Sequence, residues 1–395
     1  MASNYGGYMG RILLVDLTKE TSMEYPWTDA QRKETLGGKI LAYRILSEHL
    51  TEEEEPFSEE NRIIFSTGPL TGTGVPASVR FEITALSPKT GKIVSSNCGG
   101  RFGLFLKKAG FDAVILKGKC ASPRWIEIRD ENVHFHDACA LWGTKTSDCQ
   151  ARLKQISAAP CSSLCIGPAG EDLLTSASII CGRKAVGRAG LGAVLGWKNV
   201  KAITVSGNAA IPLYQPEDTS AEIRRWVQIL TEHPLCSDPK KISSCPGCPI
   251  RCKKPDKNTD SILNDLGIDS MDAENYRTWL LEKHGAVPDC ASASKSGQRR
   301  SKLYHSILQS LEMEDCEEAF RTYQALTDVI SASGLCIFAV IACFSTEHPG
   351  TRFPISGCLP QLLQSSTGMC FSVEDLLAIA SRKAGTDLRN AICDL

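Results

Sequence analysis

Two patterns of hydrophobic and polar positions divide the chain near residue 208. Up to that point, short runs of Val, Ile and Leu alternate with Gly, Pro and Thr, which is typical of strands joined by turns. This pattern predicts strands at residues 11–17, 62–66, 80–86, 113–117, 125–129 and 202–206, and helices at 33–50 and 147–156. Beyond residue 208, apolar residues take helical spacing at 216–232, 302–331 and 372–383. We therefore expect an α+β chain, with a β-sheet-rich domain at residues 1–208 and a mainly α-helical region at 209–395.

Composition and charge are those of an ordinary globular protein. Hydrophobic residues make up 42% of the 395 and charged residues 23%, which leaves enough apolar side chains for a sizeable core. Lys and Arg number 44 against 45 Asp and Glu, so the formal charge of -1 argues against nucleic acid as the main partner. No apolar export segment follows Met1, and the longest apolar stretch, residues 334–344, is too short to cross a bilayer. We expect a cytoplasmic protein without a membrane partner.

The chain has 18 cysteines, an unusual number for a protein of this length. Because no export signal precedes them, we expect them to stay reduced. Most are scattered singly among apolar or small residues, where a thiol acts as a small buried hydrophobe; examples are Cys98, Cys120, Cys139, Cys149 and Cys181. One group is spaced differently and predicts a metal centre.

Three thiols stand at CxxCxxxC spacing: Cys245, Cys248 and Cys252. The prolines among them stop the segment from forming a regular helix, so a tight loop can direct three thiolates at one centre. A cubane iron–sulfur cluster needs a fourth ligand, for which Cys336, in the sequence Ser-Gly-Leu-Cys, is the candidate. Structural zinc is one alternative, but it usually uses two paired CxxC knuckles. Radical enzymes that cleave S-adenosylmethionine are another, but their cysteines have the reverse order, CxxxCxxC. Three reduced structural thiols are the plain alternative.

Glycine-rich turns connect the predicted strands at residues 68–74 (GPLTGTG), 98–103 (CGGRFG), 166–171 (IGPAGE) and 187–192 (GRAGLG). Glycine permits tight turns and a close approach of the main chain to a ligand. Near the last turn, Arg183, Lys184 and Arg188 join main-chain amides in an environment that suits phosphates. Residues 190–196 also resemble a dinucleotide fingerprint, but no acidic residue follows at the required distance. The plain alternative is that these glycines let a helix pack on a sheet.

Together these motifs resemble the tungsten-containing aldehyde ferredoxin oxidoreductases. The dense part of the match is collinear over residues 5–207 and includes GRILLVDL (10–17), GPLTGTG (68–74), RFEITALSPKTG (80–91), SNCGGRFG (96–103), KKAGFDAVILKGK (107–119), LWG (141–143), IGPAGE (166–171) and GRAGLGAVLGWKNVKAI (187–203). It continues more thinly at residues 245–252, 264–269, 333–336 and from 302 to the C-terminus. The resemblance implies a base of two β-sheets for a metal held by two pterin dithiolenes, with helical domains covering it.

The resemblance also implies the cofactor contacts in this sequence. They are Arg80, Asn97, Gly99, Lys184, Ala185 and Gly187 in the N-terminal part, and Asn264, Asp269, Ser331 and Leu335 in two pterin-binding motifs. The main-chain carbonyls of Asn97 and Ala185 match ligands of a magnesium ion that bridges the pterin phosphates. In the second pterin motif, the thiolate that matches Cys336 also ligates the cluster, together with Cys245, Cys248 and Cys252.

The chain departs from the family in three respects. The first positions of the two pterin motifs, Asn264 and Ser331, are not acidic. Lys184 stands where Arg is common, and a Lys can neutralise a phosphate only as a point charge. The chain is also shorter than typical members, and sequence is missing between residues 252 and 264 and between about 287 and 302. Those missing stretches hold the family's substrate-pocket Glu and His, so the sequence names no catalytic residue.

The resemblance implies an oxidoreductase that oxidises an aldehyde to a carboxylic acid at a tungsten or molybdenum bispterin. Electrons would leave through the [4Fe-4S] cluster to ferredoxin or a similar acceptor. Oxygen-sensitive clusters imply the cytoplasm of an anaerobe, and a homodimer is one option for the assembly. The alternative is a non-catalytic relative that acts as an iron–sulfur electron-transfer or assembly subunit, and a third hypothesis is a remnant that no longer folds fully.

Overall fold

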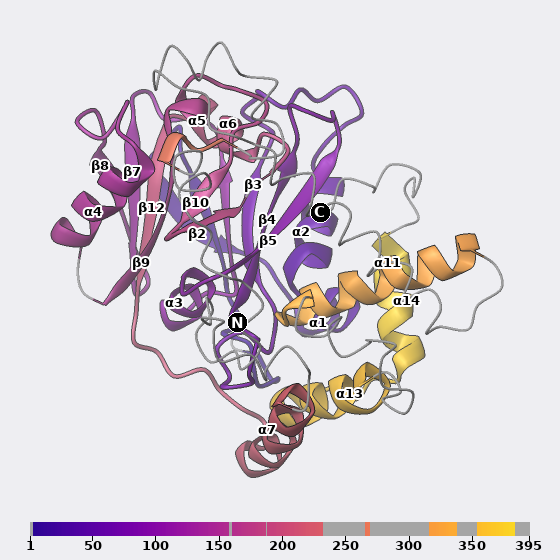
Figure 1. Ribbon diagram of the computed structural model, residues 1–395. Helices are drawn as coiled ribbons and strands as arrows, with labels where there is room; N and C mark the ends of the chain where they lie inside the picture. The colour runs from indigo at the N-terminus through magenta and orange to yellow at the C-terminus, as the bar shows by residue number, and fades with distance from the viewer. Residues whose placement is uncertain are drawn as a thin grey trace.

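Two β-sheets followed by a group of helices make up the described part of the chain (Figure 1). The structure is a computed structural model, and it describes residues 3–157, 160–186, 188–231, 265–268, 316–337 and 354–383. The expected α+β class, with sheets in the N-terminal part and helices after them, is confirmed. The domain division at residue 208 stays a prediction.

The first sheet has six strands in the order β2-β1-β6-β3-β4-β5. They are β1 (Ile12–Asp16), β2 (Thr21–Tyr25), β3 (Ile63–Thr67), β4 (Arg80–Leu86), β5 (Ile93–Gly99) and β6 (Ala113–Lys117). β1 and β6 run parallel, and the other neighbours are antiparallel. Successive residues of a strand point to opposite faces. Ile12 and Ile64 therefore pack with helix α2 (Gly38–Ser47), whereas Leu13 and Phe65 join the core shared with the second sheet.

The second sheet also has six strands, in the order β11-β10-β9-β12-β7-β8. They are β7 (Arg124–Arg129), β8 (Asn132–Asp137), β9 (Cys161–Ile166), β10 (Ile179–Cys181), β11 (Lys184–Val186) and β12 (Val200–Ser206). Only the β12–β7 pair is parallel. Ile126 and Ile203 belong to the core shared by the sheets, while Trp125 and Ala202 pack with helix α4 (Thr146–Ile156) on the opposite face.

Short helices complete the shared core. Apolar residues of α3 (Phe102–Lys108) and α6 (Leu191–Trp197) join it, and α5 (Pro168–Glu171) packs against α6. The glycines of α6 have a packing role, because a Cβ on Gly196 would lie 1.9 Å from the carbonyl oxygen of Gly170 in α5. A Cβ on Gly192 would lie 2.8 Å from main-chain atoms of Ala177 and Ser178. These two glycines of the 190–196 motif therefore let α6 pack on α5 and on the segment before β10, rather than on a sheet strand.

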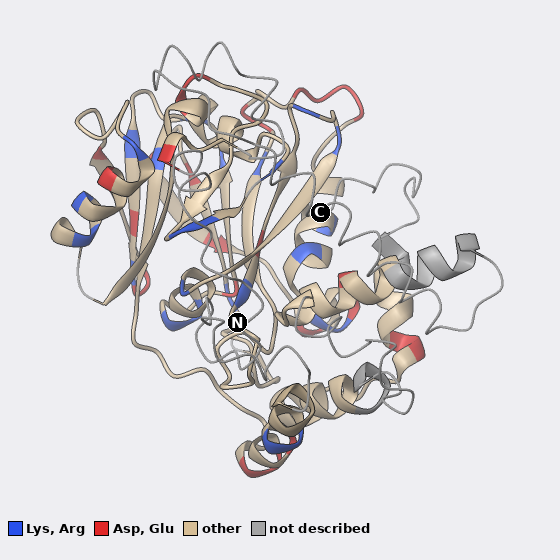
Figure 2. Cartoon of the chain, in the orientation of Figure 1, with Lys and Arg blue, Asp and Glu red and all other residues tan. Residues whose placement is uncertain are grey.

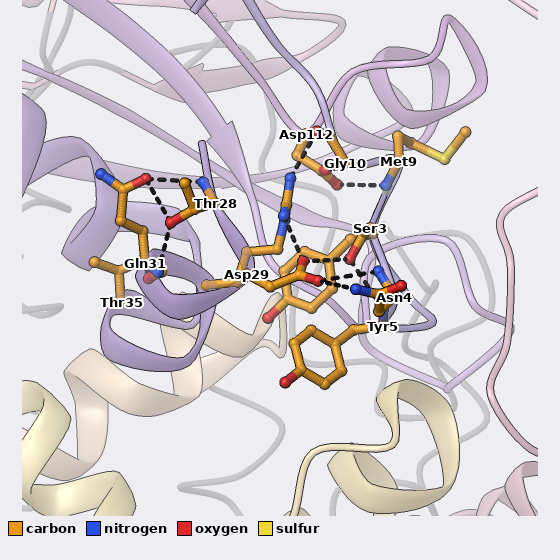
Figure 3. Close-up of polar contacts among 12 residues, drawn as sticks. Ser3, Asn4, Tyr5, Met9, Gly10, Thr28, Asp29, Gln31, Thr35 and Asp112 are labelled. Atoms are coloured by element: carbon orange, nitrogen blue, oxygen red, sulfur yellow. Dashed lines mark hydrogen bonds and ion pairs between the residues drawn. The ribbon is translucent and has the colours of Figure 1, made fainter. Parts of the chain in front are cut away.

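A polar network fixes the N-terminal segment on helix α1 (Asp29–Thr35) (Figure 3). Thr28 and Gln31 form a capping box, in which each side chain accepts a hydrogen bond from the other residue's main-chain N–H, at 2.8 and 3.3 Å. The Asp29 carboxylate accepts hydrogen bonds from Ser3 Oγ at 3.2 Å and from Asn4 Nδ2 at 2.8 Å. The chain therefore enters the first sheet from a defined position.

The C-terminal helices share a second apolar core. The described ones are α7 (Pro216–Thr231), α11 (Cys316–Ser333), α13 (Pro354–Thr367) and α14 (Val373–Lys383). α7 packs on α13, and α11 contacts both α14 and α2. Trp226 of α7 donates from Nε1 to the carbonyl oxygen of Pro76, 3.0 Å away. These helices are therefore attached to the sheets at the loop before β4.

One predicted helix is interrupted in the structure. The helix expected at residues 33–50 is two helices, α1 and α2, separated at Leu36 and Gly37. Leu36 has φ of 59°, a left-handed conformation that ends a helix, and its carbonyl oxygen accepts a 2.7 Å hydrogen bond from the Tyr8 hydroxyl. A tertiary contact therefore holds the break, which local sequence alone does not reveal.

The distribution of charged side chains agrees with the formal net charge of -1. In the view of Figure 2, Lys and Arg are interspersed with Asp and Glu over the described elements. Among the described residues, no helix combines the length and the apolar composition needed to cross a membrane. The cytoplasmic location stays a prediction.

Burial of Lys198 should give the protein a distinctive pH dependence. Its ammonium donates to the carbonyl oxygens of Gly118 at 2.9 Å and Ser58 at 3.3 Å, and burial lowers the pKa of Lys198 to about 7. In the unfolded chain the pKa returns to 10.5, so unfolding takes up a proton between these two values and stability rises with pH there. The free energy of unfolding of wild type minus that of Lys198→Met should grow by roughly 1.4 kcal/mol per pH unit across this window. Denaturant titrations at several pH values test this, and parallel profiles would show that Lys198 keeps an ordinary pKa.

Candidate functional site

The C-terminal end of α11 packs closely on the glycine-rich turn at residues 68–74. Leu70 donates its main-chain N–H to the carbonyl oxygen of Ser333 at 3.0 Å. A Cβ on Gly68 would lie 2.1 Å from the carbonyl carbon of Ser333, so only glycine fits there. Gly334 has φ of 91°, and a Cβ on it would lie 2.3 Å from Thr71 Oγ1. Two glycines, one on each segment, thus bring the second pterin motif against the first sheet.

Arg80, at the start of β4, connects this junction to β5. Its main-chain N–H donates to the carbonyl oxygen of Gly334 at 3.3 Å, and its own carbonyl accepts from Thr71 Oγ1 at 3.0 Å. Its guanidinium donates from Nε to Asn97 Oδ1, and Nη2 lies 3.5 Å from the carbonyl oxygen of Asn97. Arg80 is 9% exposed, so these bonds are largely shielded from water. Three of the motifs that the resemblance names therefore meet at one residue, through the main chain and the side chain of Arg80.

Glu82 fixes the amide of Asn97 from the other side. The Asn97 Nδ2 donates to Glu82 Oε1 at 2.5 Å, and Ser95 Oγ donates to Glu82 Oε2 at 3.1 Å. Glu82 is 2% exposed, so a carboxylate is buried directly behind the pair formed by Arg80 and Asn97. Glu82 is not among the residues that the sequence motifs predict for the site. The sequence does contain a signal for Glu82, because Arg80 and Glu82 are two positions apart on a predicted strand and therefore share a face.

The hairpin of β10 and β11 lies beside the end of β5. Cys98 and Cys181 share a thiol–thiol hydrogen bond, and a Cβ on Gly100 would lie 3.5 Å from Cys181 Sγ. Lys184 and Ala185 are the first two residues of β11 and come three and four positions after Cys181. Lys184 is half-buried and Ala185 is exposed. The structure thus brings the residues expected to meet the pterin phosphates near Asn97 and Gly99.

The candidate ligand Cys336 is next to the same junction. Its main-chain N–H donates to the carbonyl oxygen of Ala77 at 2.9 Å, and the residue is 6% exposed. Ser331, one helical turn earlier in α11, is 2% exposed, and its Oγ has no hydrogen-bond partner in the described part of the chain. Leu335 is 1% exposed in the core of the C-terminal helices. A buried hydroxyl without a partner is costly unless a ligand satisfies it.

Part of the first pterin motif is described, at residues 265–268. Gly267 accepts a hydrogen bond at its carbonyl oxygen from the main-chain N–H of Ser178 at 2.7 Å, and Ile268 forms a bridge with Ala177. Ser178 immediately precedes β10. The centre of this motif therefore lies at the entrance to the hairpin that carries Lys184 and Ala185.

Several expected residues lie outside the described part of the chain. They are Gly187, Asn264, Asp269, Cys245, Cys248 and Cys252. Within the described ranges, no group of three or more His, Cys, Asp or Glu side chains could hold a metal ion. The iron–sulfur ligand set and the outer residues of the first pterin motif remain predictions.

Comparisons with known proteins agree with the motifs. The model of the aldehyde ferredoxin oxidoreductase N-terminal domain matches residues 12–207. The tungsten-containing aldehyde ferredoxin oxidoreductase of Pyrococcus furiosus is 37% identical over 233 residues, which cover 58% of this chain and 38% of that enzyme. A second protein of that organism, an aliphatic sulfonate oxidoreductase, WOR-like subunit, is 32% identical over 244 residues, 57% of this chain and 39% of that protein.

A solved structure has the same fold. It is the active site complex BamBC of benzoyl coenzyme A reductase in complex with 1,5 dienoyl-CoA, with a TM-score of 0.74 and 18% identity. The superposition covers 96% of this chain and 88% of that chain. At this identity the likeness shows the fold alone.

The fold and the family match define residues 12–207 as an N-terminal domain of the aldehyde ferredoxin oxidoreductase type, built on two β-sheets. Through this domain the chain belongs to the aldehyde ferredoxin oxidoreductase family. The matched part spans only 38% of the length of the P. furiosus enzyme.

Proposed function

We propose that this chain binds a tungsten or molybdenum bispterin and oxidises an aldehyde to a carboxylic acid. The proposal rests on one observation above all, the convergence at Arg80 of β4, β5 and the end of α11. Family membership supports it, because curated relatives of this N-terminal domain are tungsten-containing oxidoreductases. Domain 1–208 would hold the cofactor, and region 209–395 would cover it.

The residues present fit such a cofactor. β5 and β11 are edge strands of their sheets, so alternate main-chain carbonyls there face no neighbouring strand. The carbonyls of Asn97 and Ala185, from these two strands, would hold the magnesium ion, since a hard cation prefers oxygen ligands. Lys184 would neutralise phosphate charge, and the buried Ser331 hydroxyl would bond a pterin ring.

When bound, the bispterin metal would supply the redox chemistry of aldehyde oxidation. The chain's own residues would orient and shield it. Arg80, held by Asn97 and backed by the Glu82 carboxylate, would present a fixed guanidinium, because both of its neighbours are themselves bonded. Gly99 would let the main chain approach closely, and Leu335 would help to exclude water. Gly187, Asn264 and Asp269 would complete the contacts.

Electrons would leave through a [4Fe-4S] cluster held by Cys245, Cys248, Cys252 and Cys336. Cys336 is attached by its main chain to Ala77, three residues before Arg80, which would keep cluster and pterin close. Ferredoxin or a similar protein would accept the electrons one at a time. An oxygen-sensitive cluster suits an anaerobe's cytoplasm, and a homodimer would be compatible with this arrangement.

A specific observation favours a second function. The match spans 38% of the length of the P. furiosus enzyme, and the resemblance implies that the stretches with a substrate-pocket Glu and His are missing. The chain would then bind the cluster or the cofactor without turnover, as an electron-transfer or assembly subunit. An assay of aldehyde-dependent dye reduction separates the two, because this alternative predicts bound cofactor and no activity.

The test of the cofactor site is Arg80→Ala, compared with Arg129→Ala. Arg80→Ala removes the guanidinium and leaves Asn97 without its donor, so we expect at least a tenfold loss of bound tungsten or molybdenum and of dye reduction. Arg129 is an exposed Arg on β7, 48% exposed and paired with Glu127, so its variant should keep both. Full metal content in folded Arg80→Ala would contradict the proposed site, and metal loss in both variants would point to general destabilisation.

The cluster is tested by Cys248→Ser. A missing thiolate ligand should abolish the broad visible absorbance of an iron–sulfur cluster in anaerobically purified protein. Cys139→Ser, at an exposed cysteine outside the motif, should keep it. Full cluster absorbance in Cys248→Ser would remove Cys248 from the ligand set.

A further inference from the structure

Two cysteines outside the candidate site are in direct contact on the outer face of the second sheet. Cys149 lies in the first turn of α4, and Cys165 lies on β9, beneath that helix. The two thiols share a hydrogen bond, and Cys165 Sγ also lies 3.7 Å from the carbonyl oxygen of Thr146. Both residues are 0% exposed, in one apolar cluster with Trp125 and Leu153.

The surroundings make the two thiols unequal. The hydrogen bond from Cys165 lowers the pKa of Cys149, and the nearby ammonium of Lys201 acts in the same direction, although burial and the Glu171 carboxylate oppose them. The same hydrogen bond, together with burial, raises the pKa of Cys165 well above its usual range. Lys201 is itself held in place by Thr144 O at 3.0 Å and by an ion pair with Glu171. A thiol with a lowered pKa beside a thiol with a raised pKa is the arrangement of an attacking and a resolving cysteine.

We propose that Cys149 and Cys165 are a peroxide-sensitive dithiol that closes to a disulfide between α4 and β9. The Cys149 thiolate attacks one oxygen of hydrogen peroxide, the O–O bond breaks, and Cys149 becomes a sulfenic acid while hydroxide leaves and is protonated to water. The Cys165 sulfur then attacks the Cys149 sulfur, the S–O bond breaks, and a second water leaves with the Cys165 proton. Two thiols are oxidised by two electrons, and one peroxide is reduced to two waters.

The oxidant must be small and neutral because neither sulfur is exposed. Hydrogen peroxide is close to water in size, whereas glutathione disulfide would need the helix to leave the sheet. The disulfide would close a short loop and tie α4 covalently to β9, whose hydrogen-bonded neighbour β10 leads into the hairpin with Lys184. The inference does not depend on the bispterin proposal.

Other thiols serve as internal comparisons. Cys98 and Cys181 also share a hydrogen bond, which raises the pKa of Cys181 as the bond from Cys149 raises that of Cys165, but this pair lies in the core between the two sheets. Cys120 is buried without a cysteine partner among its described neighbours, and burial raises its pKa to about 12. We expect Cys98, Cys181 and Cys120 to stay reduced under conditions that oxidise Cys149.

The test uses the full chain, reduced and then treated anaerobically with graded hydrogen peroxide before alkylation under denaturing conditions. Cleavage after Lys, Arg and Glu separates the relevant cysteines, because Cys149 lies in residues 146–152, Cys165 in 155–171, Cys181 in 172–183 and Cys98 in 93–101. We expect a disulfide between 146–152 and 155–171, assigned to Cys165 rather than Cys161 by fragmentation, while Cys120 is still fully alkylated. We also expect the melting temperature of the oxidised protein to rise by several degrees.

Variants give a second readout. In Cys165→Ala the sulfenic acid on Cys149 has no resolving thiol, so dimedone should label Cys149 in the native protein; Cys149→Ala should give neither label nor cross-link. The proposal fails if Cys149 remains fully alkylated at a peroxide concentration that oxidises Cys120. It also fails if Cys149 is linked mainly to a cysteine other than Cys165. Because the wild-type cross-link needs no variant, a poorly folded mutant leaves the test intact.

Discussion

Gly68→Ala should unfold the junction between the glycine-rich turn and α11 and destabilise the protein by about 3 kcal/mol. The new Cβ would lie 2.1 Å from the carbonyl carbon of Ser333 and 2.2 Å from the nitrogen of Gly334. Both are main-chain atoms, so no rotamer change can relieve the overlap. The hydrogen bond from Leu70 to Ser333 would be lost as the segments move apart. Denaturant unfolding and proteolysis of α11 measure the effect.

Gly103→Ala is the matched control. Its Cβ would lie 3.1 Å from the Cβ of Phe81 and no closer than 3.4 Å to a main-chain atom, and alanine favours the helix α3 that contains it. We expect a change within about 1 kcal/mol. Equal stability of Gly68→Ala and wild type would mean that the end of α11 does not pack on this turn.

Lys107→Met should cost about 3–5 kcal/mol, because it leaves a buried carboxylate without its cation. Lys107 is 0% exposed and Asp112 is 1% exposed, with 3.0 Å between Nζ and Oδ1. Asp112 also accepts hydrogen bonds from the main-chain N–H groups of Met9 and Gly10, at 3.1 and 2.7 Å. This pair fixes the start of β1 against the loop before β6. Thermal and denaturant unfolding measure the loss.

Two further variants test whether the loss of stability comes from leaving the buried Asp112 charge without its cation. Lys107→Met combined with Asp112→Asn should recover part of the stability, since the buried negative charge is gone. Lys117→Met, which removes a half-exposed partner of Asp16, should cost less than about 1 kcal/mol. If the double variant is as unstable as the sum of the single ones, the two side chains do not interact.

Strands rich in Val, Ile and Leu were predictable, whereas those formed by small or polar residues were not. β4 and β6 have the bounds that their apolar runs predict. β9 begins Cys-Ser-Ser, and β10 and β11 have three residues each, so no local period marks them. They are strands because β12 and β9 offer main-chain partners, which is a tertiary effect. Residues 98 and 99, expected in a turn, end β5 for the same reason.

The candidate site was predictable in its parts but not in its assembly. The resemblance named Arg80, Asn97 and Ser331, and the structure brings their segments together. The contact of Arg80 with Gly334 joins residues 254 positions apart, a separation that no sequence spacing can encode. Glu82 was missed because a carboxylate in a strand is usually a solvent-exposed residue, and only the fold buries it.

The metal content of the wild-type chain tests the central claim most directly. The protein should be produced in an anaerobic host that makes tungsten and molybdenum pterins, purified without oxygen, and analysed for metals and pterin. We expect about one tungsten or molybdenum atom, two pterins and about four iron atoms per chain. Folded protein that contains no group-six metal and no pterin would contradict the account.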